Sequence, residues 1–76
     1  MHPTKKEILE ADLDTLWEAL KFYYHVIDAW VDMELVTDSG KTVYMVTLSN
    51  EFDNETITLS IDELWGIYNW YTVRLQ

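Results

Sequence analysis

The sequence is organised around residues 4–32, TKKEILEADLDTLWEALKFYYHVIDAWVD, which contain neither glycine nor proline. They open on a capping-box pattern, in which the Thr4 hydroxyl accepts a hydrogen bond from the amide of Glu7 while the Glu7 carboxylate reaches back to the cap. Large apolar residues then recur at steps of three and four: Leu9, Leu13, Leu16, Leu20, Tyr23, Ile27 and Trp30. This spacing places them on one helical face, so we predict one continuous helix from about Thr4 to Asp32.

A second series with the same spacing lies on the opposite side of this helix and is mostly acidic. Its members are Glu7, Glu10, Asp14, Glu18, Lys21, His25, Asp28 and Asp32. Acids at this spacing lie about 5–6 Å apart and repel by a few tenths of a kcal/mol, so stability alone would favour interspersed lysines. A row of carboxylates can instead copy a row of phosphates and engage a basic groove. The alternative is a solvated acidic face, and the sequence leaves both open.

The weak point of the predicted helix is the cluster Phe22-Tyr23-Tyr24-His25-Val26, whose residue types favour strands. A helix that breaks near Lys21, with a strand starting there, is the alternative. We prefer the continuous helix because both periodic series pass through the cluster in phase.

The rest of the chain has the pattern of a three-stranded meander and a second helix. Strands are predicted at Met33–Thr37, Thr42–Leu48 and Glu55–Leu59, with Asp38-Ser39-Gly40 as the first turn. Ser60 and Glu63 repeat the capping-box pattern and open a helix to about Arg74. Gly66 in its middle costs about 0.5–1 kcal/mol relative to alanine, which suggests a close backbone approach. The predicted fold class is α+β: a long N-terminal helix, an antiparallel meander and a C-terminal helix in two layers.

Composition limits the partners. With 76 residues and no cysteine, the chain is expected to form a single domain over residues 1–76. Its 14 acidic and 5 basic residues leave a formal net charge of −9. Direct binding of nucleic acid or of an anionic membrane is disfavoured, because both require clustered lysine and arginine. The hydrophobic content of 49% is sufficient for a folded core, so the charge indicates a basic partner or solubility alone.

The sequence shows no targeting pattern. No apolar segment follows the early lysines as in a signal peptide, and no apolar run approaches the ~18 residues of a spanning helix. We therefore expect a cytoplasmic protein, in the host cell cytoplasm if it is phage-encoded.

No motif for catalysis or cofactor binding is present. Glu51, Asp53 and Glu55 form a second acidic group, but they lack the residue order of a calcium loop, and a plain polar turn is the simpler interpretation. His25 lacks a second histidine nearby to complete a metal site. We expect no enzymatic activity, no cofactor and no bound metal.

The acid series from Glu10 to Asp32, the hairpin Asp38-Ser39-Gly40 and the capping box at Ser60–Glu63 together resemble small acidic inhibitors encoded by phages and mobile elements, such as anti-CRISPR proteins. Several of these are single domains of this size, some with the order helix–meander–helix. The resemblance covers most of the chain by architecture and includes no diagnostic motif, so no functional residue is carried over. It implies a protein that occupies a nucleic-acid-binding or catalytic surface of its target.

We therefore expect a non-enzymatic acidic inhibitor, a nucleic-acid mimic that binds a basic, nucleic-acid-binding surface of a target protein such as a CRISPR-Cas effector. The residues expected to contact the partner are Glu7, Glu10, Asp14, Glu18, Asp28, Asp32 and, as an exposed aromatic anchor, Trp70. The alternative is a structural or regulatory interaction module, for example a homodimer, that associates through aromatic surface while the acids keep it in solution.

Overall fold

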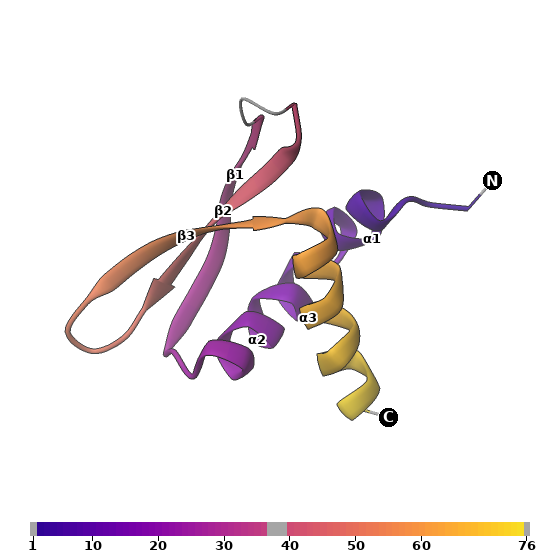
Figure 1. Ribbon diagram of the computed structural model, residues 1–76. Helices are drawn as coiled ribbons and strands as arrows, with labels where there is room; N and C mark the ends of the chain where they lie inside the picture. Colours follow the sequence, from indigo (N-terminus) through magenta and orange to yellow (C-terminus); the bar gives the residue numbers. More distant parts are fainter. Residues whose placement is uncertain (1, 37–39, 76) are drawn as a thin grey trace.

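The computed structural model describes residues 2–36 and 40–75, with Met33–Val36 described through their backbone only. Its elements are, in order, α1 (Lys5–Ala11), α2 (Leu13–Tyr24), β1 (Asp28–Val36), β2 (Thr42–Ser49), β3 (Asn54–Ser60) and α3 (Ile61–Arg74). The strands form one antiparallel sheet in the order β1-β2-β3, and the helices gather on one side of it (Figure 1). The predicted α+β class and the three-stranded meander are confirmed.

The predicted continuous helix over Thr4–Asp32 is wrong, because this segment forms two helices and the start of a strand. The first break lies at Asp12, whose φ of −133° and ψ of 50° are not helical, and whose amide donates to the carbonyl of Leu9 at 3.3 Å. The bend lets Leu9 on α1 enter the same core as Leu16 on α2; these side chains are 2% and 1% exposed. Only half of the capping box predicted at Thr4 forms: the Glu7 amide donates to Thr4 Oγ1 at 3.1 Å, but Glu7 Oε1 accepts from the Thr4 hydroxyl at 3.2 Å instead of from the cap amide.

The second break follows Tyr24, where His25 adopts the left-handed conformation with φ 55° and ψ 47°. The chain is extended again from Asp28, five residues before the predicted strand start at Met33. The alternative break near Lys21 is therefore closer to the structure than the continuous helix. Burial explains this outcome, because Ala29 is only 1% exposed and reaches the core from a strand.

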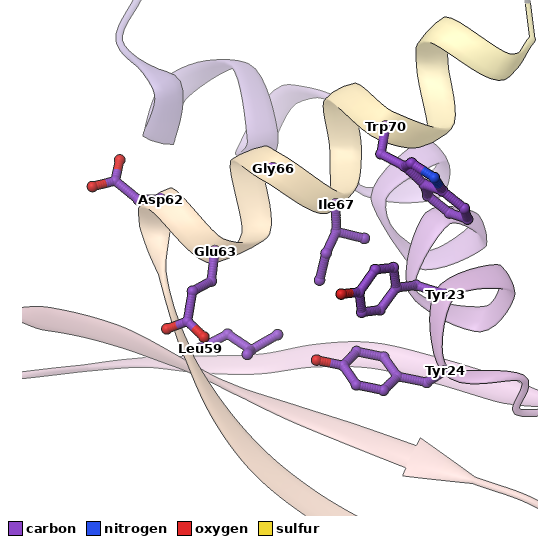
Figure 2. Close-up of a pocket in the computed structure, with 8 residues that line it drawn as sticks. All are labelled: Tyr23, Tyr24, Leu59, Asp62, Glu63, Gly66, Ile67 and Trp70. Atoms are coloured by element: carbon purple, nitrogen blue, oxygen red, sulfur yellow. The ribbon is translucent and has the colours of Figure 1, made fainter.

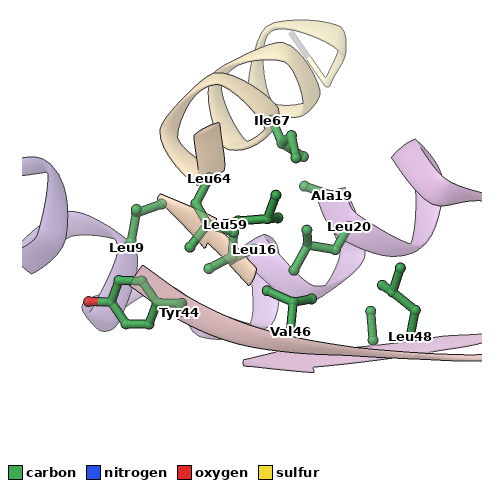
Figure 3. Close-up of a cluster of buried hydrophobic side chains, with 11 residues drawn as sticks. Leu9, Leu16, Ala19, Leu20, Tyr44, Val46, Leu48, Leu59, Leu64 and Ile67 are labelled. Atoms are coloured by element: carbon green, nitrogen blue, oxygen red, sulfur yellow. The ribbon is translucent and has the colours of Figure 1, made fainter. Parts of the chain in front are cut away.

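The helices cover one of the two faces of the sheet. Along β2, Tyr44, Val46 and Leu48 are buried beneath the helices, while the residues between them face the side without helices (Figure 3). Val46 pairs with Val31 on one neighbour strand and with Ile57 on the other, which sets the register of the core. The buried cluster consists of Leu9, Leu16, Ala19, Leu20, Ala29, Tyr44, Val46, Leu48, Leu59, Leu64 and Ile67.

The first predicted turn lies largely outside the described residues, since Asp38 and Ser39 are not among them. Gly40 is described and has a φ of +81°, the left-handed conformation that glycine adopts without steric cost. The second capping box is confirmed: Ser60 Oγ accepts from the Glu63 amide, and Glu63 Oε1 accepts from the Ser60 amide, both at 3.1 Å.

A hydrogen bond fastens the bend between α1 and α2 to α3. The Tyr68 hydroxyl donates to Asp12 Oδ2 at 2.8 Å, and this bond is the largest cause that lowers the pKa of Asp12 below its ordinary value of 3.8. It joins residues 56 positions apart in the chain.

Replacing Tyr68 by phenylalanine is expected to lower the free energy of unfolding by about 1 kcal/mol at neutral pH, because one hydrogen bond is lost with little change in shape. Since the folded-state pKa of Asp12 is depressed, the effect is fully present above 3.8 and disappears as the pH falls through the lowered value. Urea unfolding of both proteins across this range measures it. Tyr71→Phe on the same helix is the control, and an equal loss in both variants at every pH would contradict the assignment.

Candidate functional site

The structure distributes the predicted partner-binding residues over four elements. Glu7 and Glu10 lie on α1, Asp14 and Glu18 on α2, Asp28 and Asp32 on β1, and Trp70 on α3. The six carboxylate side chains are exposed, as is Trp70 with 36% of its surface. They do not form one edge, because the bend at Asp12 and the turn at His25 separate them. The prediction of a single straight row of phosphate-like charges is therefore wrong, although the acidic surface itself is present.

Most of the basic side chains are engaged within the protein. Lys5 Nζ lies 3.1 Å from Asp62 Oδ1, Lys6 Nζ lies 4.0 Å from Glu10 Oε1, and Lys21 Nζ lies 2.9 Å from Glu18 Oε1. The hydrogen bond to Glu18, followed by its charge and that of Asp28, raises the pKa of Lys21. The guanidinium of Arg74 stands 4.8 Å from the centre of the Trp70 ring. Outside these ion pairs, the described side chains of Glu7, Asp14, Asp28 and Asp32 are exposed to solvent.

The segment from Asn50 to Glu55, which we call the acidic turn, presents an exposed aromatic ring. Asn50 Oδ1 accepts from the amides of Phe52 and Asp53 at 2.9 and 2.8 Å, and the Asn50 amide donates to the Asp53 carbonyl. Three hydrogen bonds thus hold a short loop in which the Phe52 side chain is 93% exposed. The flanking residues Glu51 and Asp53 are exposed as well.

Neighbouring residues extend this surface across the end of the sheet. Asp28 on β1 pairs with Ser49, which in turn pairs with Asn54 on β3. Ile27, whose amide donates to the Ser49 carbonyl, is 58% exposed. Two apolar side chains and several carboxylates therefore meet at one end of the molecule. The sequence prediction identified the acids but not the exposed Phe52, for which the signal was an aromatic residue amid five polar neighbours.

A cleft of about 320 Å³ opens between α2, α3 and the end of β3 (Figure 2). Its walls, which define the aromatic cleft, are Tyr23, Tyr24, Leu59, Asp62, Glu63, Gly66, Ile67 and Trp70. The Tyr23 ring meets Trp70 edge-on, with centroids 5.5 Å apart and planes at 85°, and meets Tyr24 at 5.0 Å and 75°. Leu59 and Ile67, each 6% exposed, supply apolar surface.

Polar groups of the aromatic cleft are gathered on one side. In Figure 2 the hydroxyls of Tyr23 and Tyr24 point toward the side where the Glu63 carboxylate lies. Burial raises the pKa of Tyr24, with smaller contributions from Tyr23 and from the charge of Glu63. Within the described part of the chain, neither hydroxyl makes a hydrogen bond and Glu63 is in no ion pair. The two hydroxyl oxygens and Glu63 Oε2 are therefore available to a ligand that donates hydrogen bonds, whereas Glu63 Oε1 accepts from the Ser60 amide.

The aromatic cleft and the acidic turn are neighbours. A second depression of about 260 Å³ separates them and is lined by Tyr24, His25, Val26, Leu48, Asn50, Asp53 and Glu55. Tyr24 thus lines both depressions. A single partner could touch the turn and enter the cleft.

In residues 2–32 and 40–75, whose side chains the structure describes, no three histidine, aspartate or glutamate side chains gather to hold a metal ion, and no polar or charged residue is buried. Among the same residues, no helix combines the length and apolar character needed to cross a bilayer. In comparisons with protein-family models, curated proteins and solved structures, no match to this chain was found, so no function is transferred to it from a relative.

Gly66 does not mark the close backbone approach that the sequence suggested. A Cβ atom built at this position would meet nothing within 4 Å outside the helix itself. The glycine lines the aromatic cleft instead, and its missing side chain leaves that space open.

Replacing Gly66 by alanine is therefore expected to stabilise the protein by about 0.5–1 kcal/mol, because alanine lowers the entropy cost of forming α3 and meets no neighbour. Urea unfolding monitored by circular dichroism measures the change. A destabilised variant would show that the backbone at this position cannot accept a side chain.

Proposed function

We propose that this protein is a non-enzymatic, acidic inhibitor that occupies a basic, nucleic-acid-binding surface of another protein. The observation that carries the proposal is the acidic turn, where Phe52 projects between Glu51 and Asp53 on a loop fixed by hydrogen bonds. Burying an exposed phenylalanine in a partner contributes about 1.5–3 kcal/mol. Surrounding carboxylates accelerate association with a positive surface and orient the encounter.

The charge of the whole molecule supports the same kind of partner. Surfaces that bind nucleic acid carry clustered lysine and arginine, which a protein of net charge −9 can neutralise. Because the acids lie on several elements, the protein would cover a basic patch rather than reproduce the regular spacing of phosphates. The resemblance to small phage inhibitors makes CRISPR-Cas effectors the first targets to test.

A homodimer is the second candidate, favoured by the side of the sheet without helices. Trp30 and Met45 lie on this side, since they alternate with the buried Ala29 and with the buried Tyr44 and Val46. Both are only partly buried. Sedimentation at micromolar concentration distinguishes the two candidates. A stable dimer on this face would mean that the exposed surface of Trp30 and Met45 serves self-association.

The triple variant Glu51→Gln, Asp53→Asn, Glu55→Gln is expected to lose the target, because the carboxylates beside Phe52 lose their charge while the loop keeps its hydrogen-bonding groups. Capture from host lysate, with release by rising salt and by added nucleic acid, measures this. Glu7→Gln, Asp14→Asn, Asp32→Asn is the comparison variant of equal net charge; it removes charge on other elements and is expected to weaken capture less than the first variant does. Capture that survives the first variant, or that resists both salt and nucleic acid, would contradict the proposal.

Replacing Phe52 by serine is expected to weaken binding by about 10-fold or more, the equivalent of about 1.4 kcal/mol. The fold should remain unchanged because the ring is 93% exposed. Surface plasmon resonance with the captured target measures the dissociation rate, and thermal unfolding checks the fold. Equal dissociation rates for both proteins would exclude Phe52 as an anchor.

A further inference from the structure

We propose that the aromatic cleft receives an arginine side chain from the basic partner. This inference rests on the proposed function, because a nucleic-acid-binding surface supplies the arginine. It adds a second contact to the acidic turn and names the chemical group that this contact recognises.

The position and size of the cleft suit such a contact. Its volume of about 320 Å³ is at the lower end of the range for pockets that hold small ligands, roughly 300–1,000 Å³. It shares the wall residue Tyr24 with the depression beside Asp53 and Glu55. A basic surface that covers the acidic turn therefore lies within reach of the cleft.

The aromatic rings favour a cation. Guanidinium groups are attracted to the faces of tryptophan and tyrosine within about 6 Å of the ring centre. Trp70 already accepts one such group from within the protein, since Arg74 stands 4.8 Å from its centre. Tyr23 and Tyr24 present further ring surface in the same cleft.

The polar groups favour arginine over other side chains. The two tyrosine hydroxyls and Glu63 Oε2 offer acceptors without partners among the described residues, and an apolar ligand would bury them unsatisfied. A guanidinium carries five donors in a plane that also stacks on aromatic rings, whereas an ammonium carries three donors on a point charge. Glu63 retains one oxygen for a ligand, since only Oε1 accepts from the Ser60 amide.

Gly66 provides an independent indication that the space is kept open. Glycine in the middle of a helix makes α3 less stable than alanine would. No packing neighbour requires it, since nothing lies within 4 Å of a Cβ placed there. A larger side chain at this position would stand at the wall of the cleft and obstruct it.

The test is an NMR titration of the ¹⁵N-labelled full chain with the peptide acetyl-Gly-Arg-Gly-amide. A matched peptide with citrulline keeps the shape and removes the charge. We expect saturable shifts of the Gly66 amide and the Trp70 indole N–H, with a dissociation constant on the order of 1 mM for so small a ligand. The citrulline peptide should bind at least about 10-fold more weakly, because it loses the cation–π and ionic contributions.

Two variants and one control distinguish binding in the cleft from general electrostatic attraction. Gly66→Leu should abolish the Trp70 shift without unfolding the protein, whereas Val73→Leu, at a position on α3 that is 67% exposed and outside the cleft, should leave it unchanged. Glu63→Gln keeps an acceptor for the helix cap and should weaken binding about 10-fold through the lost charge.

Equal shifts by the arginine and citrulline peptides, or undiminished binding by folded Gly66→Leu, would overturn this inference. If the arginine peptide causes no shifts in the cleft but target capture still depends on the acidic turn, the arginine-binding inference alone is wrong and the proposed function stands. If target capture does not depend on the acidic turn but the peptide titration gives the expected result, the proposed function is wrong and the arginine-binding cleft stands.

Discussion

One constraint shapes this structure: a single layer of helices has to bury one side of a three-stranded sheet in a chain without cysteine. The helix α2 covers this side of the sheet with Leu16, Ala19 and Leu20, none of which is more than 1% exposed. Leu9 reaches the same cluster only because the chain bends at Asp12, and Ala29 only because the chain turns at His25 and becomes a strand. Small domains have little core to spare, so completing this cluster outweighs the continuity of a helix.

The periodicity of the sequence identified the buried leucines of α1 and α2, but it missed the buried Ala19, placed the exposed Tyr23 on the same face and did not show where the helices break. Leu9 and Leu16 are seven residues apart, two helical turns, so their phase is the same whether or not the helix bends between them. Residues 26–31, VIDAWV, are so apolar that both a helical and an alternating pattern fit them, and only burial against the sheet decides for the strand. The capping box at Ser60 was predictable because it depends only on two residues three positions apart, Ser60 and Glu63.

The candidate site was less predictable than the fold for the same reason. The sequence indicates which residue types lie on the surface, but their arrangement depends on where the chain turns. Because the predicted helix is not continuous, the acids do not form the expected row. The aromatic cleft combines residues 23–24, 59 and 62–70, which no short window of sequence brings together. The capping of α3 was predicted correctly, but the sequence did not identify Ile67 on this helix as a wall of the cleft. Its position there follows from its packing against the core.

Gly66 and Phe52 are positions where the chain departs from what stability alone favours. Glycine weakens a helix in which a larger residue has room, and Phe52 exposes an aromatic ring on a loop held by three hydrogen bonds. Natural sequences tend to break local rules at functional sites and to remain consistent elsewhere. Here the two departures lie in adjoining surfaces, because Tyr24 lines both the cleft beside Gly66 and the depression beside the acidic turn. Both departures would belong to the contact surface that we propose for a basic partner.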